Sequence, residues 1–219
     1  MAKLPGGALA TRPLHFIWIA DCSGSMYGDK INQLNYAIRN AIPEMQAVAR
    51  ENPNAEVLVR AVKFNDGVQW QLAQPTPVEN FQWQELGADG STAMGKALQL
   101  VATELDTGKL GERALPPVLV LITDGQPTDD FKGGLAALMN QRWGQKAVRI
   151  GIAIGGDADL GVLQQFIGNG ELKPLQANNA EQLVRYIRWV STAVLKAASA
   201  PPSQAQGAAP AAGNAPDVW

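Results

Sequence analysis

The sequence predicts an α/β fold with a doubly wound, mainly parallel central sheet of about six strands and helices on both faces. Three apolar runs are typical of strands buried on both sides of such a sheet: residues 14–20, 118–123 and 148–154. The turn Asn65-Asp66-Gly67 joins the expected strands 56–64 and 68–72 as a hairpin. The hairpin predicts one antiparallel edge strand.

Helical patterns alternate with these strands. Apolar residues recur at helical spacing from Ile31 to Val48, with Asp29 placed to cap the start, and Pro43 predicts a kink or break. Four more helices are expected, at 93–105, 129–141, 160–167 and 180–196. A short edge strand is expected at 172–175. This alternation is what indicates the parallel sheet.

Composition predicts one domain and sets aside several classes of function. The chain has 219 residues, of which 46% are apolar, and this suits a single core. We expect a lead-in at 1–13, the domain at 14–196 and a flexible Ala/Pro-rich tail at 197–219. The formal net charge is -2, without a block of Lys and Arg, so nucleic acid is not an expected partner.

The single cysteine, Cys22, excludes an intramolecular disulfide and fits a reducing compartment, so a cytoplasmic location is expected. No apolar run approaches the length of a membrane helix, so no membrane association is expected. The only histidine, His15, has no acid or metal partner at ligand spacing and is expected to be structural.

Three polar segments follow or lie between the apolar runs. Asp21, Ser23 and Ser25 alternate directly after the first strand, and Asp124-Gly125 follows the strand at 118–123. Thr92 stands in a small-residue loop between them. Because ligands of open α/β sheets bind outside the carboxyl ends of the strands, these oxygens are expected to converge. Oxygen ligands suit a hard divalent cation such as Mg²⁺.

These segments resemble the metal-ion-dependent adhesion site of von Willebrand factor A (VWA) domains: Asp-x-Ser-x-Ser, a Thr in a Gly-rich loop, and Asp-Gly after a buried strand. All five positions of the pattern are filled, by Asp21, Ser23, Ser25, Thr92 and Asp124. The resemblance covers about residues 15–196 in element order. It implies a site for Mg²⁺, or for Mn²⁺ or Ca²⁺. Within the family, the chain resembles the compact bacterial tellurium-resistance TerY-like group.

The resemblance implies a metal-dependent protein-protein interaction module, in which a Glu or Asp of a partner protein completes the shell of the cation. The TerY-like group implies a stress-response or metal-resistance system with a protein kinase and a PP2C-type phosphatase as partners. An alternative is an adaptor coupled to an AAA-type ATPase, as in VWA proteins similar to magnesium-chelatase subunits. In both cases the chain itself is expected not to be an enzyme.

A metal-dependent phosphohydrolase is a minor alternative, because the loop after the first strand holds no lysine or second acid beside Asp21. A nucleophilic role of Cys22 lacks a histidine base, and its position predicts a side chain that points into the core. A further alternative has Asp21 and Asp124 capping loops without a metal. Trp83 is expected either to line the rim of the site or, more simply, to pack under a loop.

Overall fold

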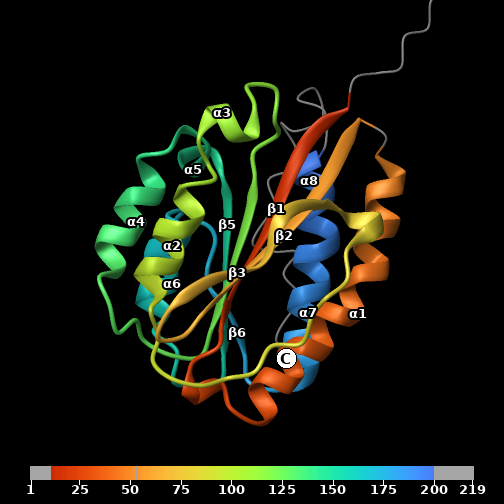
Figure 1. The fold of residues 1–219 in the computed structure, drawn as a ribbon. Coiled ribbons are helices and arrows are strands. Elements are labelled where there is room, and N and C mark those ends of the chain that lie inside the picture. Colours follow the sequence, from red (N-terminus) through yellow and green to blue (C-terminus); the bar gives the residue numbers. More distant parts are fainter. Residues whose placement is uncertain (1–10, 53, 200–219) are drawn as a thin grey trace, which may run out of the picture.

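The computed structural model describes residues 11–52 and 54–199. Most of the expected lead-in at 1–13 and nearly all of the expected tail at 197–219 therefore lie outside the described residues. Six strands form one sheet in the order β3-β2-β1-β4-β5-β6. Helices cover both of its faces (Figure 1). This is the α/β architecture that the sequence predicts.

The strands are mainly parallel. β1 (Arg12–Asp21) pairs in parallel with β2 (Ala55–Phe64) and with β4 (Val118–Thr123), which in turn pairs with β5 (Val148–Ile154). β6 (Leu175–Ala177) extends the sheet beyond β5. β3 (Val68–Pro77) pairs antiparallel with β2 and is the expected antiparallel edge strand. Its prolines are tolerated because an edge strand leaves one side of its backbone unpaired.

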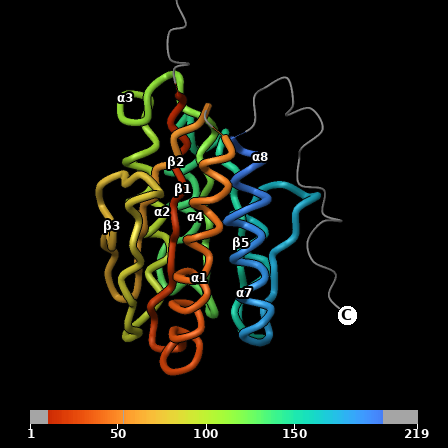
Figure 2. The backbone as a smooth tube through the Cα atoms, turned by 90° about the vertical axis from the view of Figure 1, so that its right-hand side faces the viewer, coloured from red at the N-terminus to blue at the C-terminus, as the bar shows by residue number. Residues whose placement is uncertain are grey.

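The two faces of the sheet pack against different sets of helices (Figure 2). Phe16 and Trp18 face α1 (Asp29–Glu51) and α7 (Ala180–Trp189), whereas Ile17 and Ile19 face the other layer. The other layer is formed by α2 (Met94–Ala102), α4 (Phe131–Met139), α5 (Arg142–Lys146) and α6 (Leu160–Ile167). The remaining described elements are short: the helices α3 (Thr107–Leu110) and α8 (Leu195–Ser199), the 3-10 turns Gly24–Met26 and Val78–Asn80, and a π-helical stretch at Val190–Val194. Alternate residues of β1 thus build two separate cores.

Several details differ from the sequence expectations. Asp29 is the first residue of α1 rather than its cap, and the capping position is Gly28. α1 continues as one helix through Pro43, because Pro43 is exposed and the carbonyl that loses its donor belongs to Arg39 on the same exposed side. The expected helix at 129–141 corresponds to α4 alone, and α5, which begins at Arg142, is a helix that the sequence analysis does not predict. The last strand lies at Leu175–Ala177 rather than at 172–175.

Among the described residues, no helix combines the length and the apolarity that crossing a membrane requires.

Candidate metal centre

Asp21 is the last residue of β1, and both of its carboxylate oxygens are held by hydrogen bonds. The backbone amide of Ser23 donates to Asp21 Oδ1 at 2.8 Å, and Thr123 Oγ1 donates to Asp21 Oδ2 at 2.5 Å. Asp21 is fully buried. The hydrogen bond from the Ser23 amide stabilises the turn after β1, and the hydrogen bond from Thr123 links the ends of β1 and β4. The carboxylate is therefore fixed in orientation by its neighbours.

The two serine hydroxyls connect Asp21's loop to the end of β4. Ser23 Oγ lies 3.1 Å from Ser25 Oγ, and Ser25 Oγ donates to Asp124 Oδ1 at 2.7 Å. Asp124 follows β4 directly and is 1% exposed. A continuous row of polar oxygens thus runs from β1 to β4, although Ser25 and Asp124 are 99 residues apart in the chain.

Thr92 reaches the same place from the loop before α2. Its amide donates to Thr128 Oγ1 at 3.1 Å, and the amide of Thr128 returns a bond to the Thr92 carbonyl at 3.0 Å. A Cβ added to Gly125 would lie 3.7 Å from Ser25 Oγ and 3.8 Å from Thr92 Oγ1. The two hydroxyls therefore border the same small space beside Gly125. The structure brings all five predicted site residues to one end of the sheet.

The Thr92 loop is fastened to the loop after β1 by backbone hydrogen bonds. The amide of Asp89 donates to the Cys22 carbonyl, and the amide of Gly24 donates to the Gly90 carbonyl, both at 2.8 Å. The side chain of Asp66 accepts from the amide of Ser91 at 2.7 Å. The order of these loops therefore rests on contacts between segments far apart in the sequence.

Two nearby acids, Asp129 and Asp130, act as helix caps. Asp129 Oδ1 and Oδ2 accept from the amides of Gly95 and Lys96 at the start of α2, and Asp130 accepts from the amide of Gly133 in α4. Trp83 lies away from the site. Its indole donates to Asn35 Oδ1 at 2.9 Å, and its ring meets that of Phe81. The packing alternative for Trp83 is the one that the structure favours.

Three residues that contact this region are not singled out by the sequence pattern. Lys30, in the first turn of α1, places its Nζ 2.5 Å from Asp124 Oδ2, so a lysine does lie near the site although the loop holds none. Thr123 orients Asp21, and buried Asn35 binds the backbone of Leu86 ahead of the Thr92 loop. Thr123 carries a signal in the sequence, because it is the one polar residue of an otherwise aliphatic strand.

Burial dominates the electrostatics of the site. It raises the pKa of Asp21, and hydrogen bonds from Thr123 and Ser23 oppose that rise. Burial also raises the pKa of the neighbouring Cys22 thiol to about 12. Cys22 is 2% exposed and packs in the core, as expected, so it is unsuited to nucleophilic attack.

The donor set fits a hard divalent cation. It consists of two carboxylates and three hydroxyls, all of which are oxygen donors. Within residues 11–52 and 54–199, no group of three or more His, Cys, Asp and Glu side chains is gathered at metal-binding distance. The described residues therefore contain no metal site built from three or more Cys, His or acidic side chains. Two acids and several neutral oxygens match a cation that keeps part of its water shell.

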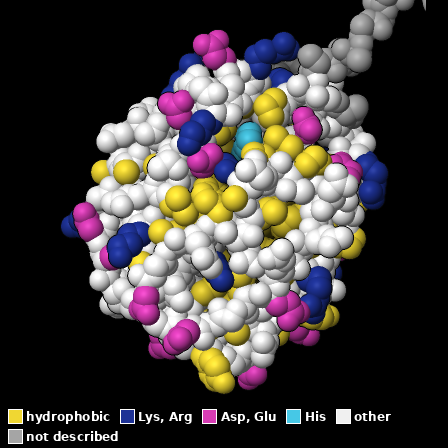
Figure 3. Space-filling view, in the orientation of Figure 1, with side chains coloured by type: hydrophobic (Ala, Val, Ile, Leu, Met, Phe, Trp, Pro, Cys, Tyr) yellow, Lys and Arg dark blue, Asp and Glu magenta, His cyan; other side chains and the backbone are white. Residues whose placement is uncertain are grey.

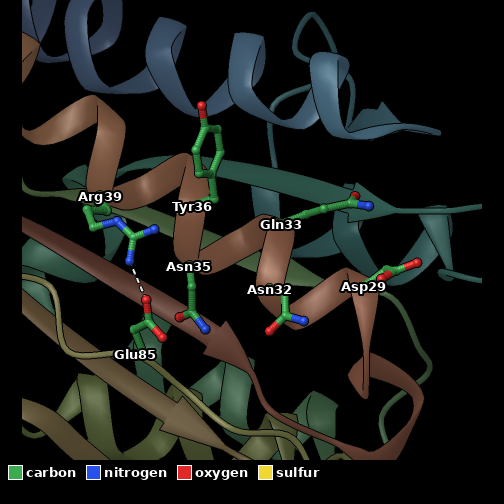
Figure 4. Close-up of a pocket in the computed structure, with 7 residues that line it drawn as sticks. All are labelled: Asp29, Asn32, Gln33, Asn35, Tyr36, Arg39 and Glu85. Atoms are coloured by element: carbon green, nitrogen blue, oxygen red, sulfur yellow. Dashed lines mark hydrogen bonds and ion pairs between the residues drawn. The ribbon is translucent and has the colours of Figure 1, made fainter.

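A shallow pocket of about 380 Å³ lies along α1, and none of the five site residues lines it. Figure 4 shows Tyr36 and Asn35 on α1 with Arg39 paired to Glu85 across the pocket. Its lining residues are all of polar types, and it is open to solvent. It is therefore separate from the convergence of oxygens at the end of β1 and β4.

Comparison with known families gives one match over most of the chain. The family model described as the von Willebrand factor type A domain matches residues 17–185. The matched segment includes all five predicted site residues.

Solved structures share the fold at low sequence identity. Proximal thread matrix protein 1 from the mussel byssus, in a form with a zinc-occupied MIDAS motif, is 17% identical with a TM-score of 0.60, and the match covers 83% of this chain and 48% of that one. A von Willebrand factor type A protein from Catenulispora acidiphila is 18% identical with a TM-score of 0.59, covering 85% and 43%. The PilB minor pilin from Streptococcus sanguinis is 16% identical with a TM-score of 0.61, covering 91% and 65%. The chain spans less than two thirds of the length of each.

Proposed function

The chain belongs to the von Willebrand factor type A family, and on that premise we propose that it binds a divalent cation and, through it, a carboxylate of a partner protein. Mg²⁺ is the preferred cation, with Mn²⁺ and Ca²⁺ as the other candidates. The proposed ligands are the two acids and three hydroxyls of the candidate centre: Asp21, Ser23, Ser25, Thr92 and Asp124.

The observation that carries this proposal is the convergence of oxygens from three separate segments. Ser23, Ser25 and Asp124 form a connected row with spacings of 3.1 and 2.7 Å, and Thr92 Oγ1 borders the same space beside Gly125. Loop capping alone does not explain this arrangement, because the serine hydroxyls point to one another and to Asp124 rather than to backbone amides. Such preorganised oxygens lower the cost of ordering a cation site.

The protein holds the proposed ligand oxygens in place, and because three of the five ligands are neutral hydroxyls, it supplies only two negative charges to the cation. Thr123 and the amide of Ser23 keep Asp21 in place, while Ser25 orients Asp124. A bound divalent cation supplies an open coordination position with residual positive charge, which suits a Glu or Asp of a partner. Binding is reversible and needs no covalent step, so the proposed role is recognition rather than catalysis.

The surface around the centre indicates further properties of the partner. Tyr27, two residues after Ser25, is 81% exposed and offers an aromatic contact beside the site. Several acids lie at this end of the sheet: Asp29 at the start of α1, and Asp66, Asp89 and Asp157 in the loops. Figure 3 shows acidic side chains at the lower end of the molecule, where these acids lie, interspersed with Lys and Arg, and further acids at the upper end. We therefore expect a partner carboxylate that is flanked by Lys or Arg.

The cellular setting is a narrower proposal, which rests on the resemblance to the TerY-like group and on cysteine usage. The TerY-like resemblance supports a bacterial stress-response or metal-resistance system with a protein kinase and a PP2C-type phosphatase. The single buried cysteine supports a cytoplasmic location. An AAA-type ATPase is the other candidate partner. Co-purification from the native host in the presence of Mg²⁺ distinguishes the two, since each predicts a different co-purifying enzyme.

The metal proposal is tested by calorimetric titration of Mg²⁺ and Mn²⁺ into chelator-stripped protein. The wild type is expected to bind one equivalent, and Ser23→Ala with Ser25→Ala is expected to lose at least tenfold in affinity. Ser91→Ala, in the Thr92 loop but outside the proposed ligands, is the matched control and is expected to bind as the wild type does. Equal binding by all three proteins would refute the assignment of the two serines.

A further inference from the structure

Lys30 brings a fixed positive charge to the candidate metal centre. Its Nζ lies 2.5 Å from Asp124 Oδ2, and the two side chains are 31% and 0% exposed. The lysine stem passes the end of β5, where a Cβ added to Gly155 would lie 3.7 Å from Lys30 Cε. A bond of this kind to a buried carboxylate is shielded from solvent on one side, so its charge is felt strongly within the site.

The two oxygens of Asp124 face different groups. Oδ1 accepts from the Ser25 hydroxyl, which belongs to the row of proposed ligands, whereas Oδ2 accepts from Lys30. A cation among the hydroxyls can therefore use Oδ1 while Lys30 stays on Oδ2. The ammonium and the cation are neighbours on one carboxylate, and their charges repel.

We propose that Lys30 sets the charge of the loaded centre, so that it weakens cation binding and strengthens the binding of a partner carboxylate. This inference rests on the proposed function. Asp21 and Asp124 carry two negative charges and Lys30 one positive charge, so a divalent cation leaves the loaded centre with a net charge of +1. Without Lys30 the loaded centre is neutral, and its attraction for an anion is weaker.

The test compares two affinities in Lys30→Met and in the wild type. Mn²⁺ is titrated into chelator-stripped protein, and acetate is then titrated into the Mn²⁺-loaded protein, with displacement of bound water followed by water-proton relaxation. Lys30→Met is expected to bind Mn²⁺ about tenfold more tightly and acetate several-fold more weakly, as expected from the loss of one nearby charge. Lys30→Arg keeps the charge and is expected to stay within about threefold of the wild type in both affinities.

Lys196→Met is the matched control, because it removes the same charge near the C-terminal end of α1, about 30 Å from the site along the helix. It is expected to change neither affinity. Removing Lys30 also leaves buried Asp124 without its counterion, so the rise in Tm on adding Mn²⁺ is expected to be larger in Lys30→Met.

Unchanged or weaker Mn²⁺ binding by folded Lys30→Met, beside a wild type that does bind, would overturn this inference and leave the metal site standing. Tighter Mn²⁺ binding with unchanged acetate binding would also overturn it. If neither protein binds Mn²⁺, the proposed function fails and this inference fails with it.

Discussion

Thr123 Oγ1 donates a hydrogen bond to Asp21 Oδ2 at 2.5 Å, and the two residues end the neighbouring strands β4 and β1. Both side chains are fully buried. The same Thr123 oxygen accepts from the amide of Gly125 at 3.2 Å. One hydroxyl therefore joins the two strand ends that carry the proposed acidic ligands.

Thr123→Val keeps the shape of this side chain and removes its hydroxyl. It leaves a buried carboxylate oxygen without its donor, so we expect a loss of about 1.5 to 3 kcal/mol in the free energy of unfolding. Metal affinity is expected to fall as well, because Asp21 is no longer fixed. Denaturant unfolding and Mg²⁺ titration check the two effects. Thr123→Ser retains the hydroxyl and is expected to preserve most of the unfolding free energy and most of the metal affinity. Equal losses in Thr123→Val and Thr123→Ser would contradict the role of the hydroxyl.

Asn35 couples α1 to the segment that leads to Thr92. Its Nδ2 donates to the Leu86 carbonyl, and its Oδ1 accepts from the Leu86 amide and from Trp83 Nε1, all at 2.9 Å. Asn35→Ala leaves several buried polar groups unpaired, so a loss of about 2 to 4 kcal/mol in unfolding free energy is expected.

Faster hydrogen exchange at residues 81–93 is the second readout for Asn35→Ala, since these hydrogen bonds order that segment. Asn40→Ala is the comparison, because Asn40 is exposed on the same helix and, within the described part of the chain, its side chain bonds the Tyr36 carbonyl four residues earlier. An equally small effect of both substitutions would show that Asn35 does not hold the segment.

α2 and α4 approach closely at two glycines. A Cβ on Gly95 would lie 2.3 Å from the Asp130 carbonyl oxygen, and one on Gly134 would lie 2.3 Å from the Gly95 carbonyl oxygen. Gly95→Ala therefore has to push two backbones apart. We expect a loss of about 1 to 3 kcal/mol despite alanine's better helix propensity. Thermal unfolding measures it, with Gly170→Ala as the control, since a Cβ there would meet none of the residues that the structure describes within 4 Å.

His15 is expected to make stability depend on pH. Burial, with a smaller effect of the Arg60 charge, lowers the pKa of His15 to about 4, and Glu104 opposes this. The folded protein thus keeps His15 neutral, while the unfolded chain takes up a proton below about pH 6.5. The contribution of His15 is complete above pH 6.5 and is lost as the pH falls toward 4.

The size of this loss is about 3 kcal/mol, from a pKa difference of roughly two and a half units. Unfolding free energies of the wild type and of His15→Leu, measured from pH 7.5 to pH 4, check it. The difference between the two proteins is expected to shift in favour of His15→Leu as the pH falls. A constant difference across this range would contradict the burial of a neutral imidazole.

Much of the fold follows from local patterns. β1, β4 and β5 are continuous apolar runs, which is the pattern of strands buried on both faces, and the hairpin turn at Asn65 identifies the antiparallel edge. The three-residue strand β6 is too short to leave such a pattern, so its predicted position is wrong by a few residues. The continuity of α1 through Pro43 depends on which side of the helix faces solvent, and this is set by the tertiary structure.

The candidate centre likewise contains residues that the sequence predicts and residues that only the tertiary structure reveals. Four of the five proposed ligands, Asp21, Ser23, Ser25 and Asp124, stand at or just after the ends of recognisable strands, so topology predicts that they meet. Thr92 stands in the loop before α2, and its place is expected from the resemblance to the family pattern. Lys30, Asn35 and Thr123 contact partners that lie 94, 51 and 102 residues away, respectively. No local pattern predicts the contacts of Lys30 and Asn35, because a lysine or an asparagine in a helix ordinarily faces solvent. Thr123 is recognisable as the polar end of an aliphatic strand, but the strand does not identify its partner. Their roles depend on how α1 and β4 are placed against the loops.

The most direct test of the proposed centre is the location of a bound cation. Crystals of the protein grown with Mn²⁺ are expected to give an anomalous difference peak roughly 2.2 Å from the Ser23 and Ser25 hydroxyl oxygens, beside Asp21, Asp124 and Thr92. The same crystals grown with a chelator serve as the control. A Mn²⁺ peak elsewhere, such as among the exposed acids Asp66 and Asp89, with none between the two serines, would contradict the assignment.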